Sequence, residues 1–245
     1  MKFAITSAKL KIIGMITMVL LNLAMLGVVT QPVLKYFCGI VGSASLTIFA
    51  FLISEGYRHT SNINKYVLRV LIFAIIAAFP QRAILFIVNE GKTDLSAYFN
   101  AGLSAFLCLT VISTYDKLKE KSLRYALMGM MCFLSFVLNF YAAPFVFVLM
   151  FIIHINRENF PKMAYYITTL YLSLFAVGVF FKLTNSGYNG GNLLELDQMI
   201  YQVGCILPLP LLYKYNGQEG VKLKWIVYTF YPLTLVIIML LLHLR

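Results

Sequence analysis

The sequence has little charge. Of its 245 residues only 12% are Asp, Glu, Lys or Arg, whereas a soluble domain carries about 25%. So few charged side chains cannot cover a surface that faces water, which excludes an ordinary soluble enzyme and a separate soluble catalytic module. Acidic residues are the scarcest, with 9 against 20 basic residues, and the formal net charge is +11.

The signatures of several kinds of functional site are also missing. None of the four cysteines forms a Cys-x-x-Cys pair or lies at metal-ligand spacing from one of the three histidines, so we expect no metal site. There is no glycine-rich phosphate loop and no Ser-His-Asp pattern. The basic residues are scattered through short segments instead of gathering on one soluble face, so we expect no nucleic-acid partner.

What the sequence does contain is long apolar stretches. Hydrophobic residues make up 61% of the chain and the mean hydropathy is +0.84. About twenty apolar residues in a helix cross the hydrocarbon core of a bilayer, because a helix rises about 1.5 Å per residue. The sequence therefore predicts an all-α protein, a polytopic helical bundle in the lipid bilayer with one integral membrane domain over residues 1–245. Nine spans are expected, at about 10–29, 38–56, 66–87, 96–114, 125–140, 142–156, 163–183, 198–214 and 225–243.

The basic residues predict how these spans are oriented. If nine helices cross and the N-terminus is cytoplasmic, fifteen of the twenty basic residues lie inside. Cytoplasmic loops of membrane proteins carry such an excess of Lys and Arg. We therefore expect a multi-pass protein of the cell (cytoplasmic) membrane, with the connection 184–197 outside. The five basic residues on the outer side are then Lys35, Arg82, Lys92, Lys182 and Arg245.

Four of the spans are expected to be irregular. The fifth and sixth are short and are separated by a tight turn near Phe140 and Tyr141, so they could form a hairpin that does not fully cross. Pro80 should kink the third span, and Pro208 and Pro210 should distort the eighth. Neighbouring helices would satisfy the backbone groups that these prolines release.

Polar side chains inside the spans are candidates for a substrate pocket, because polar groups in hydrocarbon are costly. Asn22, Arg82, Asn100 and Gln202 would line an outward-leaning polar cavity if their helices were neighbours. A second interpretation is structural. Asn and Gln often bridge helices at roughly 0.6 kcal/mol per hydrogen bond, and Arg82 could extend to the outer headgroups.

A second candidate site lies where the second span ends. Glu55 and His59 are four residues apart and share a helix face, with Arg58 alongside. Histidine titrates near neutral pH and a carboxylate can tune it, so the two residues could form a general acid–base pair. They could equally form a structural ion pair that closes the helix at the cytoplasmic surface.

Three blocks of the sequence resemble the TraX family, which is named for the membrane protein that acetylates the N-terminus of conjugative pilin. The resemblance implies a bundle similar to the membrane acyltransferases. It also implies acetyl-CoA or another acyl-CoA as donor, and a membrane or secreted peptide as acceptor and partner. The blocks are Lys11–Met18, Ile48–Arg69 with its core Glu55-Gly56-Tyr57-Arg58-His59-Thr60, and Tyr215–Gly220 with Tyr228–Leu233.

The chain departs from the family pattern at its titratable positions. An Asp-His pair of the pattern aligns with Leu21 and Asn22, an Arg with Ser43, and a His with Thr234. Ser43 and Thr234 therefore join Asn22, Arg82, Asn100 and Gln202 as pocket candidates. The family-motif residues that remain, besides the predicted catalytic pair Glu55 and His59, are Gly56, Thr60, Tyr215, Asn216, Gly217, Tyr231 and Pro232.

Two hypotheses follow from this pattern. In the first, the chain is a membrane acyltransferase in which Glu55 and His59 take over the acid–base chemistry at the cytoplasmic face. The basic residues Arg58, Lys65 and Arg69, with the segment Lys117–Lys121, would attract the phosphates of coenzyme A. In the second, the chain is a catalytically silent relative that acts as a membrane binding, immunity or assembly partner.

Overall fold

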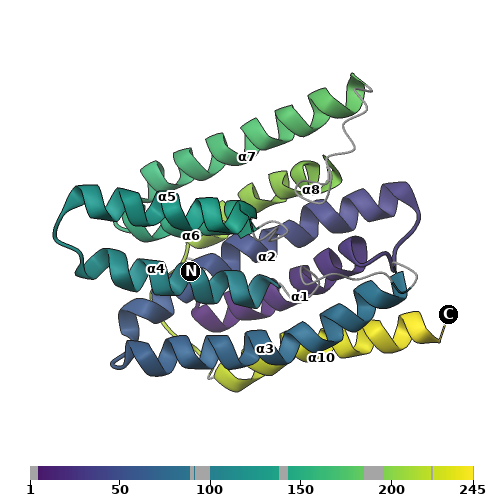
Figure 1. Cartoon of the computed structure of the whole chain (residues 1–245), viewed down its shortest axis with the longest axis horizontal. Helices are drawn as coiled ribbons and strands as arrows, with labels where there is room; N and C mark the ends of the chain where they lie inside the picture. The colour runs from purple at the N-terminus through teal and green to yellow at the C-terminus, as the bar shows by residue number, and fades with distance from the viewer. Residues whose placement is uncertain are drawn as a thin grey trace.

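The computed structural model describes residues 5–88, 91, 100–137, 143–184, 196–221 and 223–244. Apart from one bridge between Ile5 and Tyr215, the regular structure in these ranges is helical, so the predicted all-α class is confirmed. The helices lie roughly parallel and antiparallel in one bundle (Figure 1). They are α1 (Ser7–Met25), α2 (Pro32–His59), α3 (Ile63–Val88), α4 (Ala101–Lys117), α5 (Lys121–Val137), α6 (Ala143–Asn156), α7 (Phe160–Leu183), α8 (Leu196–Tyr201), the 3₁₀ helix η2 (Gln202–Ile206), α9 (Leu209–Tyr213) and α10 (Lys224–His243).

The predicted spans lie where the helices lie. Some of the helices, however, are shorter than a membrane crossing requires. Five helices are long and apolar enough to cross a membrane by length and composition: α1, α2, α3, α7 and residues 225–243 of α10. Helices α4, α5 and α6 have 17, 17 and 14 residues. The number of crossings and their orientation stay predictions. The expected turn at Phe140 and Tyr141, and residues 185–195 of the long connection, lie outside the described residues.

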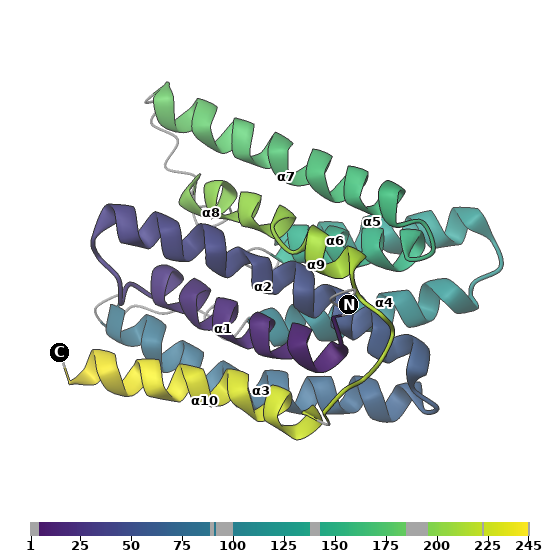
Figure 2. The ribbon, with the colours of Figure 1, turned by 180° about the vertical axis from the view of Figure 1, so that it is seen from behind.

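Helix α2 is the centre of the bundle. In the most apolar stretch of 18 residues of α2, 56% of the residues are buried. The corresponding share in the other four long helices is 17–33%. Its glycines allow this burial, because a Cβ on Gly42 would lie 2.3 Å from the backbone nitrogen of Leu21, and one on Gly39 would lie 2.5 Å from the ring of Tyr201. Small residues of this kind let helix backbones approach closely. Helix α2 is therefore packed between α1 and the segment α8–η2–α9 (Figure 2).

The eighth predicted span is broken, as its prolines predict. It consists of α8, η2 and α9, with Pro208 at the N-cap of α9 and Pro210 in its first turn. The break begins ahead of the prolines, at Gln202. The hydroxyl of Thr47 on α2 donates to the backbone carbonyl of Cys205 at 2.8 Å. A neighbouring helix thus satisfies a backbone group in the irregular segment, as an apolar environment requires.

The outward faces of several helices are apolar. Exposed side chains on α3 include Ile72, Ile76 and Phe79, and those on α10 include Ile237 and Leu241. Large exposed apolar faces of this kind mark a surface that does not face water. The apolar faces and the five long apolar helices together indicate a multi-pass protein of the lipid bilayer.

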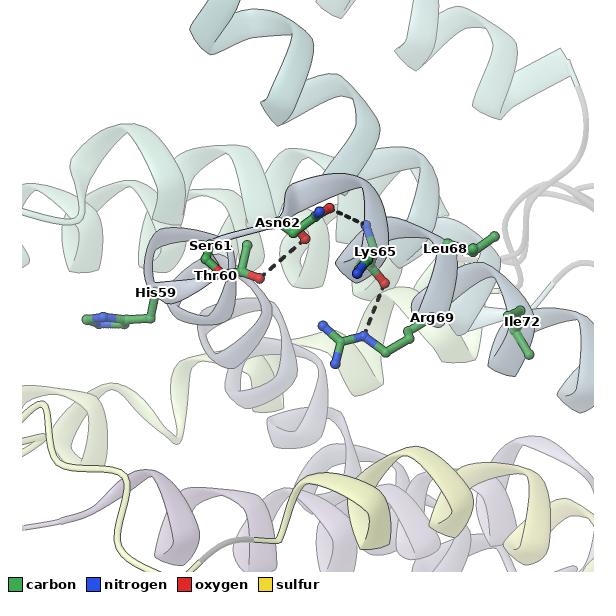
Figure 3. Close-up of a pocket in the computed structure, with 8 residues that line it drawn as sticks. All are labelled: His59, Thr60, Ser61, Asn62, Lys65, Leu68, Arg69 and Ile72. Atoms are coloured by element: carbon green, nitrogen blue, oxygen red, sulfur yellow. Dashed lines mark hydrogen bonds between the residues drawn. The ribbon is translucent and has the colours of Figure 1, made fainter.

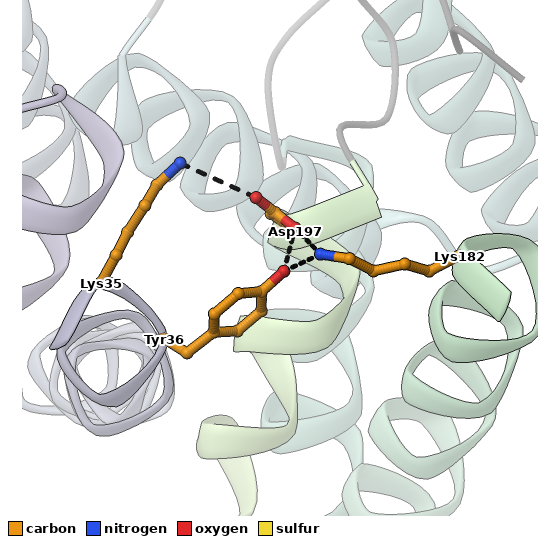
Figure 4. A network of polar contacts seen from close by, with 4 residues as sticks. All are labelled: Lys35, Tyr36, Lys182 and Asp197. Atoms are coloured by element: carbon orange, nitrogen blue, oxygen red, sulfur yellow. Dashed lines mark hydrogen bonds and ion pairs between the residues drawn. The ribbon is translucent and has the colours of Figure 1, made fainter. Parts of the chain in front are cut away.

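A polar network ties α2, α7 and α8 together at the end of the bundle where α2 begins (Figure 4). Lys182 Nζ lies 2.8 Å from Asp197 Oδ1, and Lys35 Nζ lies 3.7 Å from Asp197 Oδ2. The Tyr36 hydroxyl donates to Asp197 and accepts from Lys182. The network joins helices from distant parts of the chain, so it fixes the position of α8 against α2 and α7.

The Asn variant of Asp197 tests this network by its pH dependence. Partial burial raises the pKa of Asp197, but hydrogen bonds from Lys182 and Tyr36 outweigh burial and hold the pKa below its ordinary value. The stabilisation is therefore present above the unfolded pKa of about 4 and is lost as the pH falls through the folded pKa. Asp197→Asn should lower the free energy of unfolding by about 1 kcal/mol or less at pH 7, since the charges are partly exposed.

The measurement is the melting temperature in detergent between pH 3 and pH 7. The difference between Asp197→Asn and the wild type should shrink as the pH falls, and Glu120→Gln, at an exposed position, should show no such difference. A wild-type melting temperature for Asp197→Asn at pH 7 would contradict the prediction.

Candidate functional site

One end of the bundle gathers the Glu55 block and the Tyr215 block of the sequence. Helices α2, α4 and α6 end there, and α1, α3 and α7 begin there, at the left of Figure 1. We call it the basic end, because it carries Arg58, Lys65 and Arg69 around the α2–α3 turn, Lys117 at the end of α4 and Lys119 just after it. The predicted topology places this end on the cytoplasmic side.

The Tyr-Asn-Gly block forms a loop, residues 214–220, that holds the start of α1. The backbone nitrogen of Ile5 donates to Lys214 O at 3.1 Å, and that of Asn216 donates to Ile5 O at 3.1 Å. Gly217 and Gly220 have φ of 75° and 71°, a left-handed conformation that favours glycine. The family-motif residues Asn216 and Gly217 therefore shape the loop that connects two distant parts of the chain.

The Glu55 block lies against the same loop. Glu55 Oε1 is 3.0 Å from His59 Nε2, and Glu55 Oε2 is 3.8 Å from Arg58. Burial raises the pKa of Tyr215, and the negative charges of Glu55 and Glu219 raise it further, so Tyr215 stays protonated. Glu55 is 18% exposed and His59 is 70% exposed, which places the histidine at the rim. The predicted pairing of Glu55 with His59 is confirmed, whereas its catalytic role stays a prediction.

Two other motif residues shape the turn between α2 and α3. A Cβ on Gly56 would lie 2.8 Å from the hydroxyl of Tyr66. That hydroxyl donates a hydrogen bond to Ile53 O at 3.4 Å. Thr60 is the C-cap of α2, and its hydroxyl donates to Asn62 O at 3.5 Å. Gly56 and Thr60 thus have structural roles, and they position His59 at the end of its helix.

A pocket of about 540 Å³ opens at this turn (Figure 3). Lys65 and Arg69 supply positive charge one helical turn apart, and Arg69 Nε donates to Lys65 O at 3.1 Å. Leu68 and Ile72 give one side of the pocket an apolar lining. A pocket with this lining can hold an anionic group that is attached to a longer chain. Its lining residues are His59, Thr60, Ser61, Asn62, Lys65, Leu68, Arg69 and Ile72.

Three of the six pocket candidates in the spans lie on neighbouring helices around α2. The Ser43 hydroxyl donates to Gly39 O of its own helix at 2.9 Å. Asn22 Nδ2 on α1 and Gln202 Oε1 in η2 are buried and have no hydrogen-bond partner within the described residues. This group borders the close contact of α2 with α1 and η2, where small residues fill the space between helices.

The other three candidates lie around α3. Arg82 is exposed on α3 itself. Asn100 caps α4, because its Oδ1 accepts from Leu103 N at 3.0 Å and its Nδ2 donates to Ala74 O at 2.9 Å. The Thr234 hydroxyl donates to the carbonyl of Phe230 in its own helix at 2.8 Å. None of the six candidates lines the pocket at the basic end.

The last two motif residues join α10 to α3. The Tyr231 hydroxyl lies 3.3 Å from Gln81 Oε1 of α3, and Tyr231 packs beside Leu235 in the apolar contact of these two helices. Pro232 lies inside α10. Tyr231 therefore serves the packing of the C-terminal helix.

A third polar group at the basic end was not predicted. Asp116, at the end of α4, accepts from the Tyr57 hydroxyl at 3.0 Å and lies 3.1 Å from His154 Nε2. The rings of Tyr57 and His154 meet edge to face, with centroids 5.6 Å apart. Sequence reasoning missed the group because its members are far apart in the chain. The available signal was that His154 and Asp116 each end an apolar stretch.

Comparison with known proteins identifies the family of the chain. Residues 6–242 match the TraX protein family. The chain is 25% identical over 230 residues to the probable fimbrial assembly protein FimC, serogroup H1, of Dichelobacter nodosus, and the match covers 91% of this chain and 90% of that protein. No solved structure matches. Because the family match covers nearly the whole chain, this multi-pass membrane protein belongs to the TraX family.

Proposed function

We propose that this protein transfers an acyl group from a coenzyme A thioester to an amine or hydroxyl of a membrane-associated peptide, such as a fimbrial subunit. One observation carries the proposal. The Glu55 block and the Tyr215 block, at opposite ends of the sequence, meet at the basic end beside a positively charged pocket. The printed name of the Dichelobacter nodosus relative supports an acceptor of the fimbrial kind.

The pocket at the α2–α3 turn is the proposed donor site. Lys65 and Arg69 would bind the phosphates of the donor through charge-assisted hydrogen bonds, which are stronger than neutral ones. Leu68 and Ile72 would contact the less polar arm that carries the thioester. The position agrees with the predicted cytoplasmic side of the membrane, from which coenzyme A would arrive.

Glu55 and His59 are the proposed acid–base pair at this donor site. When the acceptor displaces coenzyme A, the carbon–sulfur bond breaks and the thiolate takes up a proton. His59 lines the pocket and can supply that proton, while Glu55, 3.0 Å away, stabilises the imidazolium. Because His59 is 70% exposed, it can regain its proton from water.

Binding of the donor can be tested on the purified protein in detergent. Acetyl-CoA at 100 times its dissociation constant should add about 2.7 kcal/mol to the free energy of unfolding. The measurement is thermal unfolding, with free coenzyme A and ATP as controls. A shift with acetyl-CoA that exceeds the shift with ATP supports the donor site. An unchanged melting temperature at millimolar acetyl-CoA would contradict it.

The role of His59 can be tested by substitution. His59→Ala should reduce acyl transfer by a factor of about 10²–10⁴, which is the usual contribution of general acid–base catalysis, at unchanged expression. The matched control is His243→Ala, in the last turn of α10 and outside the site. Full activity of His59→Ala would exclude the catalytic assignment.

A second candidate function is a catalytically silent assembly partner. It is favoured by the residues that stand where the family pattern carries titratable groups. The hydroxyls of Ser43 and Thr234 donate to carbonyls of their own helices, and Leu21 packs over Gly42. These side chains therefore serve packing. Co-isolation of a fimbrial subunit in mild detergent, with normal fimbriae in a His59→Ala strain, would favour this function, and isolation of the protein alone would count against it.

A further inference from the structure

The first turns of α3 carry two cations that form no ion pair within the described residues. Lys65 is exposed and Arg69 is half-buried, and they lie four residues apart on one face of the helix. Arg58, on the other side of the same turn, has a carboxylate, since it lies 3.8 Å from Glu55. Like charges at a spacing of four residues destabilise a helix. Lys65 and Arg69 therefore favour a bound anion.

The geometry of these two side chains suits a phosphate group. Arg69 Nε donates to Lys65 O at 3.1 Å, which holds the guanidinium beside the pocket (Figure 3). Its terminal nitrogens make no hydrogen bond within the described residues and can bind two phosphate oxygens at once. The ammonium of Lys65, one helical turn away, adds a point charge.

An apolar stripe continues from the pocket along the same face of α3. Large apolar side chains with exposed fractions of 44–65% follow at intervals of one, three or four residues, so they lie on the side of the helix that carries Lys65 and Arg69. The next charged residue after Arg69 is Arg82, about 20 Å further along the helix. We call these residues the α3 stripe, and they are Leu68, Ile72, Ile75, Ile76 and Phe79.

The cations and the α3 stripe together match an amphiphile. A soluble anion would use the cations alone and leave the stripe uncovered. Helix α3 is long and apolar enough to cross a membrane, so its exposed apolar face meets hydrocarbon and its first turns meet the headgroups. The stripe is long enough to pass through one leaflet of a hydrocarbon core that is about 30 Å thick. Basic residues at this level attract anionic lipids.

We propose that an anionic phospholipid binds at the α2–α3 turn, with its phosphate on Lys65 and Arg69 and one acyl chain along the α3 stripe. The lipid headgroup occupies the pocket that is the proposed donor site. The donor therefore has to displace the lipid before it can bind. This competition rests on the proposed function, whereas the lipid site does not.

Native mass spectrometry of the purified protein in a neutral detergent counts the lipids that each molecule binds. The probes are dioleoyl phosphatidylglycerol, which is anionic, and dioleoyl phosphatidylcholine, which has the same chains and no net charge. The first phosphatidylglycerol should bind about 30-fold more tightly than the first phosphatidylcholine, which is the contribution of two interfacial cations. Equal dissociation constants for the two lipids would overturn the proposal.

Charge variants locate the headgroup. Lys65→Gln with Arg69→Gln should abolish the preference for phosphatidylglycerol. The matched control is Lys117→Gln with Lys119→Gln, which removes the same charge at the basic end outside the pocket and should keep the preference. Equal losses in the two double variants would show a general attraction and overturn the site. If the first double variant does not fold, Lys65→Gln alone decides, with an expected loss of about fivefold.

Two further comparisons separate a lipid from a soluble phosphate. Millimolar inorganic phosphate should leave the bound phosphatidylglycerol in place, because it has no chain to contact the α3 stripe. Ile75→Ala with Phe79→Ala should weaken phosphatidylglycerol binding several-fold, whereas Ile237→Ala with Leu241→Ala, on the exposed face of α10, should not. Displacement by phosphate, or unchanged binding in the α3 variant, would overturn the assignment to a lipid.

The same spectra separate this inference from the proposed function. Acetyl-CoA and the first phosphatidylglycerol should not occur on one protein molecule, because they share Lys65 and Arg69. Molecules that carry both at the frequency of independent binding would overturn the shared pocket. A wild-type protein that binds phosphatidylglycerol selectively but binds no acetyl-CoA overturns the proposed donor site and supports the lipid site.

Discussion

The Gly204→Ala protein is expected to lose the contact between α2 and η2 and to yield little folded material. A Cβ at this position would lie 1.6 Å from the carbonyl oxygen of Ile40 and 2.6 Å from its carbonyl carbon. Both are backbone atoms inside α2, so neither can move aside as the end of a flexible side chain could. Overpacking in cores usually costs about 1–3 kcal/mol, occasionally more, and this backbone clash should exceed that range.

The contact matters because it positions the whole irregular segment. The Thr47 hydroxyl bonds to Cys205 O, and the Cys205 thiol donates to Ser43 O at 3.3 Å. Displacing η2 from α2 breaks both hydrogen bonds inside an apolar environment, where the groups find no replacement. The 214–220 loop follows directly after α9, so the candidate site would be displaced as well.

Gly129→Ala is the matched control for this substitution. Gly129 lies in α5, and a Cβ there would meet no atom within 4 Å. Alanine is favoured over glycine in helices by about 1 kcal/mol, so this variant should be at least as stable as the wild type. The measurement is the yield of monodisperse protein in size-exclusion chromatography, followed by the melting temperature. Gly204→Ala with the melting temperature of the wild type would show that the α2–η2 contact is described wrongly.

The second large effect is expected on donor binding. The double substitution Lys65→Glu and Arg69→Glu should abolish stabilisation by acetyl-CoA, because it replaces both cations of the pocket with anions. A hydrogen bond to a charged group contributes about 1.5–3 kcal/mol. Loss of two should therefore raise the dissociation constant by a factor of about 10²–10⁴. Thermal unfolding over a titration of acetyl-CoA measures this change.

A charge-matched control separates local contacts from the general field of the basic end. Lys117→Glu with Lys119→Glu changes the net charge by the same amount at the end of α4 and just after it, outside the pocket. If the phosphates bind in the pocket, this control should keep most of the stabilisation, since exposed charges beyond about 10 Å are screened at 0.1 M salt. Equal losses in the two double variants would place the donor elsewhere.

Short-range features of this protein were predictable from the sequence alone. Apolar stretches of about twenty residues indicated the helices, because their length must match the bilayer. Pro208 and Pro210 indicated the break in the eighth span. Glu55 and His59 were predicted to pair because residues four apart share a helix face, and the distance of 3.0 Å confirms the pairing. Each of these predictions depends only on neighbours along the chain.

Contacts between helices could not be predicted in this way. A helix that is apolar all round shows no preferred inner face, so the sequence did not indicate which side of α4 or α6 faces α2. The rotation and order of the helices brought Tyr57, Asp116 and His154 together, and they separated the six candidates in the spans into groups around α2 and α3.

The sequence by itself thus determined the fold class, the positions of the helices and the family of this protein. The tertiary structure decided which polar groups meet. The close approach of α2 to its neighbours, where Gly39, Gly42 and Gly204 leave no room for a side chain, sets the distances between helices. That packing is a property of several helices at once, and no single stretch of the sequence contains it.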